Sequence, residues 1–272
     1  MTTNYGIDDL DTAAAQINQL LSAAGTAVAF TGAGISTESG IPDFRSPDGI
    51  WAKNRTVYFN EFIASEEDRR EYWRQKSSIA KEFEVARPNV THEVLARLES
   101  DGVLRGVITQ NIEGLHQEAG SRNVLELHGT AREVACLSCD WRDSATPWNR
   151  RFIETQLVPR CPDCGGLIKH ATVSFGQTLP ADVLQTSADW AAESSLFLTL
   201  GSSLVVEPAA SLPRLAVQSG ASLVIVNRDP TPLDPLATIV VNAPLGELFR
   251  RLLPALHDVD ASANGDDDHR VE

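Results

Sequence analysis

The sequence has no apolar run long enough to cross a membrane and no secretory signal at its start. Its apolar stretches, such as 222–226 and 239–241, fall far short of the roughly 20 residues that a transmembrane helix needs. The opening sequence MTTNYGIDDL lacks both the basic and the apolar segment of a signal peptide. We therefore expect a cytoplasmic protein that has no membrane partner.

Positive charge is also scarce. The 272 residues include 23 Lys and Arg against 37 Asp and Glu, which gives a net charge of −14 at pH 7. Because nucleic-acid binding depends on Lys and Arg that neutralise phosphates, we expect no nucleic-acid partner. We expect residues 258–272, which are rich in acids, to form a disordered tail. The acidic net charge of the chain suits an enzyme or a protein with basic partners, and it does not indicate an oligomeric state.

Short β-rich runs alternate with helical periodicity along most of the chain. Such alternation with short connections predicts an α/β fold, a parallel sheet covered by helices on both faces. We expect strands at 26–31, 103–109, 124–127, 171–175, 196–200, 222–226 and 239–241, and helices at 7–24, 90–100, 112–119, 180–192, 209–218 and 246–256.

Two segments interrupt this alternation. Residues 58–86 are charged and aromatic with helical spacing, and they predict a helical insert. The second segment contains all the cysteines. The predicted division assigns residues 1–51, 88–128 and 171–257 to a large domain, 52–87 to the helical part of a small domain, and 129–170 to its metal-binding part.

The four cysteines form two C-x-x-C pairs, Cys136 with Cys139 and Cys161 with Cys164, separated by 21 residues. A disulfide framework is not expected in a cytosolic chain of this size. A redox C-x-x-C site needs one pair rather than two. Two turns that each present two thiolates make a closed tetrahedral site, and zinc fits four thiolates best. The predicted site holds one Zn²⁺ with no open position, so its role is structural.

A glycine-rich loop follows the strand at 26–31. Its sequence, GAGISTESGIPDFRSPDGIW over residues 32–51, begins with two glycines of a dinucleotide fingerprint, but Thr37 stands where the third belongs. Arg45 places a cation beside a predicted phosphate site. The ribose-binding acid usual at the end of a second strand is missing, which argues against an ordinary dehydrogenase.

Polar residues follow three further strands. TQNIEGLH at 109–116 offers two amides and a carboxylate, a set that suits recognition of a carboxamide. Taken alone, the octapeptide favours a simpler interpretation, an Asn helix cap with solvated neighbours. Gly201–Ser203 and Asn227–Asp229 follow the next two strands, where hydroxyls and an amide could bind ribose. His128 ends a short strand in ELHGT, and its neighbours favour it as a general base over the other histidines.

Taken in order, these segments resemble the sirtuin family in its bacterial type, the NAD-dependent protein lysine deacylases. The resemblance covers residues 25–256. It implies a Rossmann-like domain that binds NAD, a small zinc-binding and helical domain inserted into it, and a cleft between the two. It also implies a reaction in which the acyl group of a protein lysine moves to ADP-ribose and nicotinamide is released. The matching segments are the glycine string, PNVTHEVLARLE, TQNIEGLHQEAG, ELHGT, the two C-x-x-C pairs, VSFGQTLP, GSSLVVEPAA and VNRDPTPLD.

The resemblance assigns roles residue by residue. His128 matches the general base, and Asn111 is the second catalytic candidate. Val173, Ser174 and Phe175 match a strand that pairs with the acylated peptide. The implied NAD contacts are Gly32, Ala33, Gly34, Ile35, Ser36, Pro42, Asp43, Phe44, Arg45, Trp51, Gln110, Asn111, Ile112, Glu113, Gly201, Ser202, Ser203, Asn227, Arg228, Asp229 and Leu245.

The chain departs from the family at informative positions. Glu113 replaces the usual Asp, and a carboxylate shifted by about 1 Å can cost roughly 100-fold in rate. Relatives that remove succinyl groups carry Arg three residues after a Tyr, whereas Gln75 follows Tyr72 here. We therefore expect no strong preference for acidic acyl groups. The alternatives are ADP-ribosyl transfer or NAD hydrolysis on the same fold, a non-catalytic NAD-binding or zinc-ribbon module and, least favoured, a hydride-transfer dehydrogenase.

Overall fold

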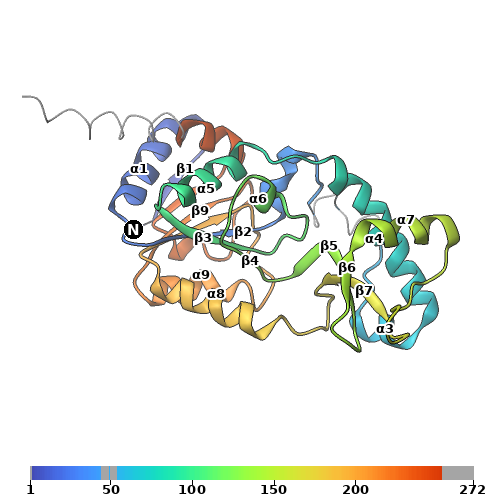
Figure 1. Cartoon of the computed structure of the whole chain (residues 1–272). Coiled ribbons are helices and arrows are strands. Elements are labelled where there is room, and N and C mark those ends of the chain that lie inside the picture. The colour runs from blue at the N-terminus through green and yellow to red at the C-terminus, as the bar shows by residue number, and fades with distance from the viewer. Residues whose placement is uncertain (1, 44–48, 50–53, 253–272) are drawn as a thin grey trace, which may run out of the picture.

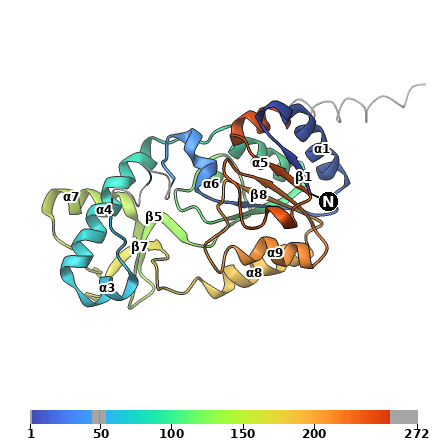
Figure 2. The same cartoon turned by 180° about the vertical axis from the view of Figure 1, so that it is seen from behind.

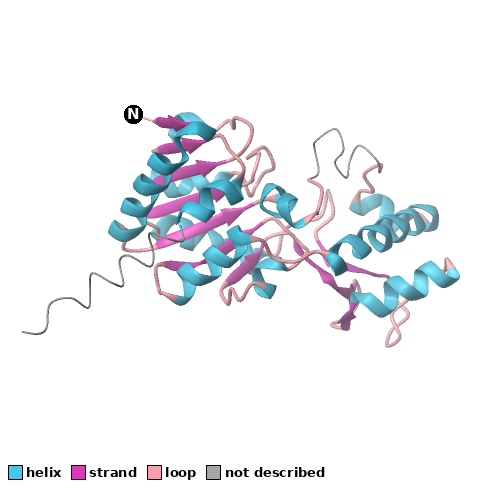
Figure 3. Ribbon diagram, turned by 90° about the horizontal axis from the view of Figure 1, so that it is seen from above, coloured by secondary structure: helices cyan, strands magenta, loops and turns pink. Residues whose placement is uncertain are grey.

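The structure is a computed structural model that describes residues 2–43, 49 and 54–252. It has a large part built on a seven-stranded sheet and a small part built on a three-stranded sheet (Figure 1). Seen from above, the small part lies beyond one end of the large sheet (Figure 3). This arrangement confirms the predicted fold class.

All strand pairs of the large sheet are parallel, in the order β1-β10-β9-β8-β2-β3-β4. Strand β2 lies at the point where the order reverses, because β3 continues on one side of it and β8 on the other. The bounds are β1 (Thr3–Tyr5), β2 (Ala27–Thr31), β3 (Leu104–Thr109), β4 (Val124–Glu126), β8 (Leu196–Leu200), β9 (Ser222–Val226) and β10 (Ile239–Val241).

Helices cover both faces of this sheet (Figure 2). One face carries α1 (Leu10–Ala23), α5 (Val90–Ser100) and a last helix over residues 245–252; the other carries α8 (Ala181–Glu193) and α9 (Ser211–Gln218). Every residue of β2 is buried. Since successive side chains of a strand point to opposite faces, Ala27 and Ala29 join the first core, and Val28 and Phe30 join the second.

The small part has its own core. Strand β5 (Gly129–Cys136) pairs antiparallel with β6 (Arg142–Ser144) and with β7 (Ile168–Thr172). Helices α3 (Phe59–Ala64), α4 (Glu66–Val85) and α7 (Ala145–Thr155) pack around these strands. Phe62, Trp73 and Phe152 fill the space between them. The predicted helical insert is thus confirmed as α3 and α4.

The strand predicted at 171–175 is wrong in position and in sheet. Strand β7 occupies Ile168–Thr172 and belongs to the small antiparallel sheet rather than to the parallel one. The prediction weighted the apolar residues Val173 and Phe175. It missed that Lys169 and His170, although polar, are buried in the small part. Residues 173–175 therefore follow the strand instead of forming it.

The helix predicted at 112–119 begins later, as α6 (Leu115–Glu118). Gly114 takes a left-handed φ of 84°, and the Glu113 side chain accepts a hydrogen bond from the Ile112 N–H, so the chain turns before the helix starts. The glycine-rich loop predicted over residues 32–51 contains a short 3-10 helix near its start, η2 (Ala33–Ser39). Two further short 3-10 helices are η1 (Ile7–Asp9) and η3 (Asp234–Leu236). In the part of the chain that is described, no helix has the length and apolar character needed to cross a membrane.

Candidate active site and metal centre

A cavity of about 1080 Å³ lies at the carboxyl ends of β2, β3, β8 and β9 and extends to the small part. Ligands of open parallel sheets bind at such strand ends, where the strand order reverses. The loops after these four strands contribute Gly32–Gly34, Gln110–Ile112, Gly201–Ser203 and Asn227–Asp229. Four segments predicted separately from the sequence are therefore brought to one cleft.

The glycines of the first loop allow two loops to touch. The Gly34 N–H donates to the Gly201 carbonyl at 2.8 Å, and a Cβ built on Gly34 would lie 2.8 Å from both Cα and O of Gly201. A Cβ on Gly32 would likewise lie 2.8 Å from that oxygen. Only glycine fits at these two positions, because the obstacle is backbone that cannot rotate away.

His128 faces this cleft from the end of the β4 segment. Its Nδ1 lies 2.9 Å from the Gln110 carbonyl oxygen. Because a carbonyl only accepts, Nδ1 carries the proton and Nε2 keeps its lone pair. Burial lowers the pKa of His128, and the bond to Gln110 opposes this shift. The neutral ring can therefore act as a base, and among the histidines that the structure describes only His128 lines the cavity.

The loop after β3 is tied to its neighbours by side chains. Gln110 Nε2 donates to Ser202 Oγ at 2.8 Å, which joins the ends of β3 and β8. Glu113 Oε1 accepts from Ser36 Oγ at 2.6 Å and from Asn111 Nδ2 at 2.9 Å. Glu113 Oε2 accepts from the Ile112 N–H at 3.0 Å. Asn111 and Ile112 line the cavity, whereas Glu113 does not.

The far end of the cleft is formed by the loop after β9 and by the start of the last helix. Asn227 Nδ2 donates to the Asp229 carbonyl at 2.7 Å, and Arg228 pairs with Asp229 at 3.0 Å. Leu245 supplies an apolar wall and is 6% exposed. Glu38, which sequence reasoning missed, also lines the cleft and accepts from the Gly246 N–H at 2.8 Å. That bond fixes the glycine loop to the last helix.

Residues 173–175 line the cleft on the small-part side. The Val173 N–H donates to the His128 carbonyl at 2.8 Å, and the Phe175 carbonyl accepts from the Phe59 N–H at 2.9 Å. Phe175 is 42% exposed and lies 6.1 Å from the Tyr58 ring. This segment thus joins His128 to α3 and places the Phe175 ring, which contacts Tyr58, on the lining of the cleft.

Most of the predicted site residues meet at this cavity. Ile35, Ser36, Pro42 and Glu113 do not line it, although Ser36 accepts a hydrogen bond from Asn111, which does. Phe44, Arg45 and Trp51 lie outside the described residues. The predicted residues that line the cavity are Gly32, Ala33, Gly34, Asp43, Gln110, Asn111, Ile112, His128, Val173, Ser174, Phe175, Gly201, Ser202, Ser203, Asn227, Arg228, Asp229 and Leu245.

The small part also supplies a wall of the cavity. Tyr72 and Gln75, which the sequence comparison had already singled out, line it from α4, and sequence reasoning missed Val57 and Lys76 beside them. Tyr72 and Lys76 are four residues apart, the spacing that places two side chains on the same helix face. Helical spacing from Tyr72 was the available signal for Lys76, whose Nζ lies 5.7 Å from the centre of the Tyr72 ring.

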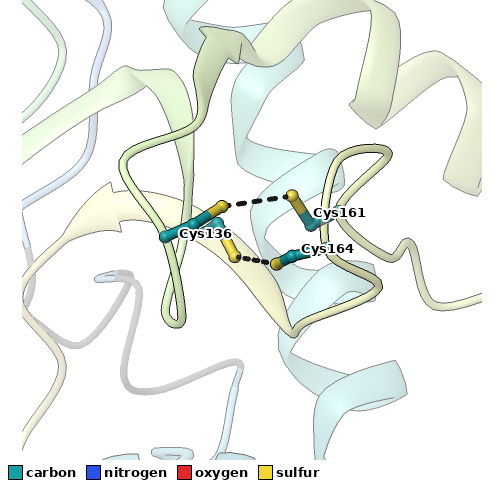
Figure 4. Close-up of side chains that lie close together, drawn as sticks. Cys136, Cys161 and Cys164 are labelled. Carbon is teal, nitrogen blue, oxygen red and sulfur yellow. Dashed lines mark hydrogen bonds between the residues drawn. The ribbon is translucent and has the colours of Figure 1, made fainter.

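The four cysteines form one cluster in the small part, at the end of β5 and in the loop after α7 (Figure 4). The sulfur atoms of Cys136 and Cys164 are 3.5 Å apart, those of Cys139 and Cys161 are 3.7 Å apart, and all four lie within 4.8 Å of one another. Four thiolates around a metal at about 2.3 Å would lie roughly 3.8 Å from one another. The spacing fits a tetrahedral metal site and is too long for disulfides.

Comparison with known proteins agrees with this geometry. The model of the Sir2 family matches residues 32–208, from the glycine loop to the loop after β8. The chain belongs to the Sir2 family.

The relatives are named NAD-dependent protein deacetylase or NAD-dependent protein deacylase. The chain is 44% identical over 234 residues, 85% of its length and 92% of the relative's, to the NAD-dependent protein deacetylase of Rhodopseudomonas palustris. It is 43% identical over 235 residues, 86% of its length and 94% of the relative's, to the NAD-dependent protein deacetylase of Thermotoga maritima. The match thus spans nearly the whole length of these relatives.

Solved structures match equally well. One described as "Sir2-p53 peptide-NAD+" has a TM-score of 0.82 and 39% identity, and the match covers 89% of this chain and 98% of that one. Another, described as "Sir2 bound to acetylated peptide", has a TM-score of 0.81, 39% identity and the same coverage. The likeness therefore includes the large sheet and the small part together.

Proposed function

We propose that this protein is an NAD-dependent protein lysine deacetylase that transfers the acyl group of a modified lysine to ADP-ribose and releases nicotinamide. One observation carries the proposal. His128, whose Nε2 is unprotonated, lines the same cleft as the glycine loop and the polar residues that follow β3, β8 and β9. The names of the relatives and the peptide and NAD⁺ complexes of the structural neighbours support it.

The chemistry of the cleft fits NAD. A cavity of about 1080 Å³ is large enough for a dinucleotide. The proposed contacts are the glycines at 32 and 34 at the phosphates, Ser202, Ser203 and Asn227 as hydrogen-bonding groups for ribose, and Leu245 as an apolar contact for adenine. Pro42, Phe44, Arg45 and Trp51 complete the proposed set from the rest of the glycine string. When bound, NAD supplies an electrophilic ribose carbon with nicotinamide as its leaving group.

The residues of the chain bind and orient NAD and the acylated peptide, and they move a proton. His128 is the proposed general base, since its Nε2 is unprotonated and faces the cleft. Residues 173–175 are proposed to hold the peptide beside it, because the Val173 N–H is bonded to the His128 carbonyl. A hydrogen bond thus joins the proposed peptide-binding segment to the segment that carries the base, which favours a reactive arrangement.

The metal of the cysteine cluster is proposed to be Zn²⁺. Four thiolates with the sulfur spacing described above leave no coordination position open for a substrate. The proposed role is structural. The metal would join the end of β5 to the loop before β7, and these two strands lead directly to His128 and Val173.

A close contact between backbone loops gives a prediction at Gly34. Gly34→Ala should lower the free energy of unfolding by about 1–3 kcal/mol, because the added Cβ would overlap the backbone of Gly201. NAD should also bind more weakly, since both loops line the cleft. Urea unfolding and calorimetric titration with NAD measure the two effects.

Gly6→Ala is the matched control, because a Cβ at Gly6 meets nothing within 4 Å. Its free energy of unfolding should stay within roughly 0.5 kcal/mol of the wild-type value. Equal effects of the two substitutions would show that the contact between the loops is unimportant.

The proposed function is tested by peptide assays with and without NAD. We expect loss of the acetyl group only when NAD is present. We also expect acetylated peptide to react faster than succinylated peptide, because Gln75 offers no cation to a terminal carboxylate and its amide already donates to Arg55 O and Glu71 Oε1. Faster removal of succinyl would contradict the predicted preference. ADP-ribose attached to protein would instead favour ADP-ribosyl transfer.

A further inference from the structure

Lys169 is a buried lysine behind the small-part side of the cleft. It lies in β7, is 2% exposed and does not line the cavity, whereas the segment 172–177 that follows it lines the cavity along its whole length. Burying an ammonium group costs free energy unless the group is paired or hydrogen-bonded. The contacts of this side chain therefore indicate what it contributes.

The Lys169 side chain donates to three oxygen atoms around the end of β7. Its Nζ donates to the His170 carbonyl at 3.2 Å, to the Thr172 carbonyl, and to Gln177 Oε1 at 3.4 Å. An ammonium group has three N–H donors, so it can supply all three acceptors. A neutral amine has two N–H groups and would leave one acceptor without its partner.

Gln177 connects Lys169 to the turn that lines the cleft. Its Oε1 also accepts from the Ser174 N–H at 3.2 Å, and its own N–H donates to the Ser174 carbonyl at 3.0 Å. Both partners of Oε1 only donate, so the orientation of the amide is fixed. Gly176 has a left-handed φ of 82°, which glycine adopts without strain in such a turn. One amide oxygen thus joins Lys169 to the turn.

The middle of the segment depends on this connection. Two backbone bonds to other parts of the cleft wall hold residues 173 and 175. Ser174 lies between them, and its N–H and carbonyl are bonded only to Gln177 in the part of the chain that the structure describes. The conformation at Ser174 is therefore determined by where the Gln177 side chain is held.

The helix beside Lys169 supplies no negative charge. On α4, the nearest charged group is the second cation Lys76, and the Nζ of each lysine lies 5.7 Å from the centre of the Tyr72 ring. Burial raises the pKa of Tyr72, so its phenol stays neutral. The Tyr72 ring can stabilise a cation only through its π face.

The strands of the small sheet supply no anion either, as far as the described residues show. Burial holds the pKa of His170 well below its ordinary value, so this ring is neutral. Glu133 of β5 pairs with Arg142 at 2.9 Å. The Lys169 charge is thus held by oxygen dipoles alone. Burial, together with the nearby Lys76, lowers the pKa of Lys169 to about 7.

We propose that Lys169 is a positioning residue that acts through Gln177 and the Thr172 carbonyl to hold residues 173–177 in the conformation that receives the acylated peptide. The identity of the peptide rests on the proposed function, whereas the hold on the segment does not. Lys169 itself touches neither the peptide nor NAD, because it does not line the cavity.

The hold on the segment is tested by hydrogen exchange of the free protein, followed by nuclear magnetic resonance. Lys169→Met removes the three donors and keeps the length of the side chain. The Ser174 and Gln177 N–H groups should then exchange roughly 10-fold faster, while those of β8 keep their rates. Lys81→Met, at an exposed lysine of α4, is the matched control and should change neither. Equal protection of Ser174 in the wild type and Lys169→Met would overturn the proposal.

The effect on the reaction is tested by steady-state assays with acetylated peptide and by calorimetric titration with NAD. Lys169→Met should raise KM for the peptide by roughly 10-fold, the worth of a hydrogen bond to a charged group. The Kd of NAD should stay within about 2-fold, because Lys169 contacts none of the loops that follow the large-sheet strands. Equal losses of both affinities would show a general structural role and would overturn the proposal, as would no change in either.

A second variant keeps the test valid if Lys169→Met fails to fold. Gln177→Glu preserves an acceptor for both donors and adds a carboxylate beside the ammonium. In the wild type, KM for the peptide should rise as the pH increases above about 7, because the neutral amine lacks a third donor. In Gln177→Glu the opposite charge favours the ammonium, so this rise should begin at least about one pH unit higher.

The same pH dependence of KM in the wild type and in Gln177→Glu would overturn the proposal. A wild-type protein that left acetylated peptide unchanged at every pH would contradict the proposed function instead. The positioning role would then stand on the faster exchange of the Ser174 N–H in Lys169→Met.

Discussion

His128→Ala should lower kcat/KM for deacetylation by roughly 10²- to 10⁴-fold, the usual contribution of a general base. The reason is the Nε2 lone pair, which faces the cleft because Nδ1 donates to the Gln110 carbonyl. Steady-state assays with acetylated peptide and saturating NAD measure the loss. NAD affinity should change little, since the imidazole acts on a proton rather than holding the dinucleotide.

Stability serves as the control for this variant. The His128 side chain makes one hydrogen bond in the part of the chain that is described, so its loss should cost about 1 kcal/mol of unfolding free energy. Activity within about 3-fold of the wild type would remove His128 from the role of base. Loss of activity together with unfolding would instead show a structural role.

The pH dependence follows from the same residue. Burial lowers the pKa of His128 below its ordinary value of about 6.5. A lowered pKa keeps the ring unprotonated at more acidic pH. As the pH is lowered, kcat/KM should therefore begin to fall only below about pH 6.5. A loss of kcat/KM that already begins well above pH 6.5 would contradict the buried environment of His128.

Cys161→Ser should remove the metal and unfold the small part. Cys161 is 3% exposed and lies in the same core as Trp73 and Phe152. Loss of one of four thiolates weakens a site whose binding free energy in small zinc domains is on the order of 10 kcal/mol. Elemental analysis should find one zinc per wild-type chain and much less in the variant, and the melting temperature should fall.

Activity should be lost with the metal, although the cysteines do not line the cleft. Strand β5 begins at Gly129, next to His128, and Gly129 is paired with Thr172 at the end of β7. Ser138→Ala is the matched control because it keeps the backbone N–H that donates to Cys136 Sγ. A Cys161→Ser protein that kept its melting temperature and activity would contradict a structural metal site.

The sequence predicted features that depend on local pattern. The burial of β2, β8 and β9 follows from their continuous apolar runs, and the cysteine cluster follows from the spacing of two pairs. Strand-end positions also brought His128 and Gln110 to one cleft. These features could be predicted from the sequence because each depends on neighbouring residues in the chain or on the general geometry of parallel sheets.

Other features depend on contacts between distant residues. Position 113 was expected to face NAD, but its carboxylate is used by Ser36, 77 residues away. The small sheet was missed because β7 buries Lys169, whose Nζ finds carbonyl acceptors at His170 and Thr172. Strand β1 was missed because its sequence, TNY, is polar and occupies an edge of the sheet.

The most direct test of the account is mass spectrometry of the small products formed from NAD and an acetylated peptide. Acetylated ADP-ribose, nicotinamide and unmodified lysine in equal amounts are the predicted result, because the acetyl group, the sugar and His128 share one cleft. Free acetate without acetylated ADP-ribose, or ADP-ribose linked to the peptide, would contradict it.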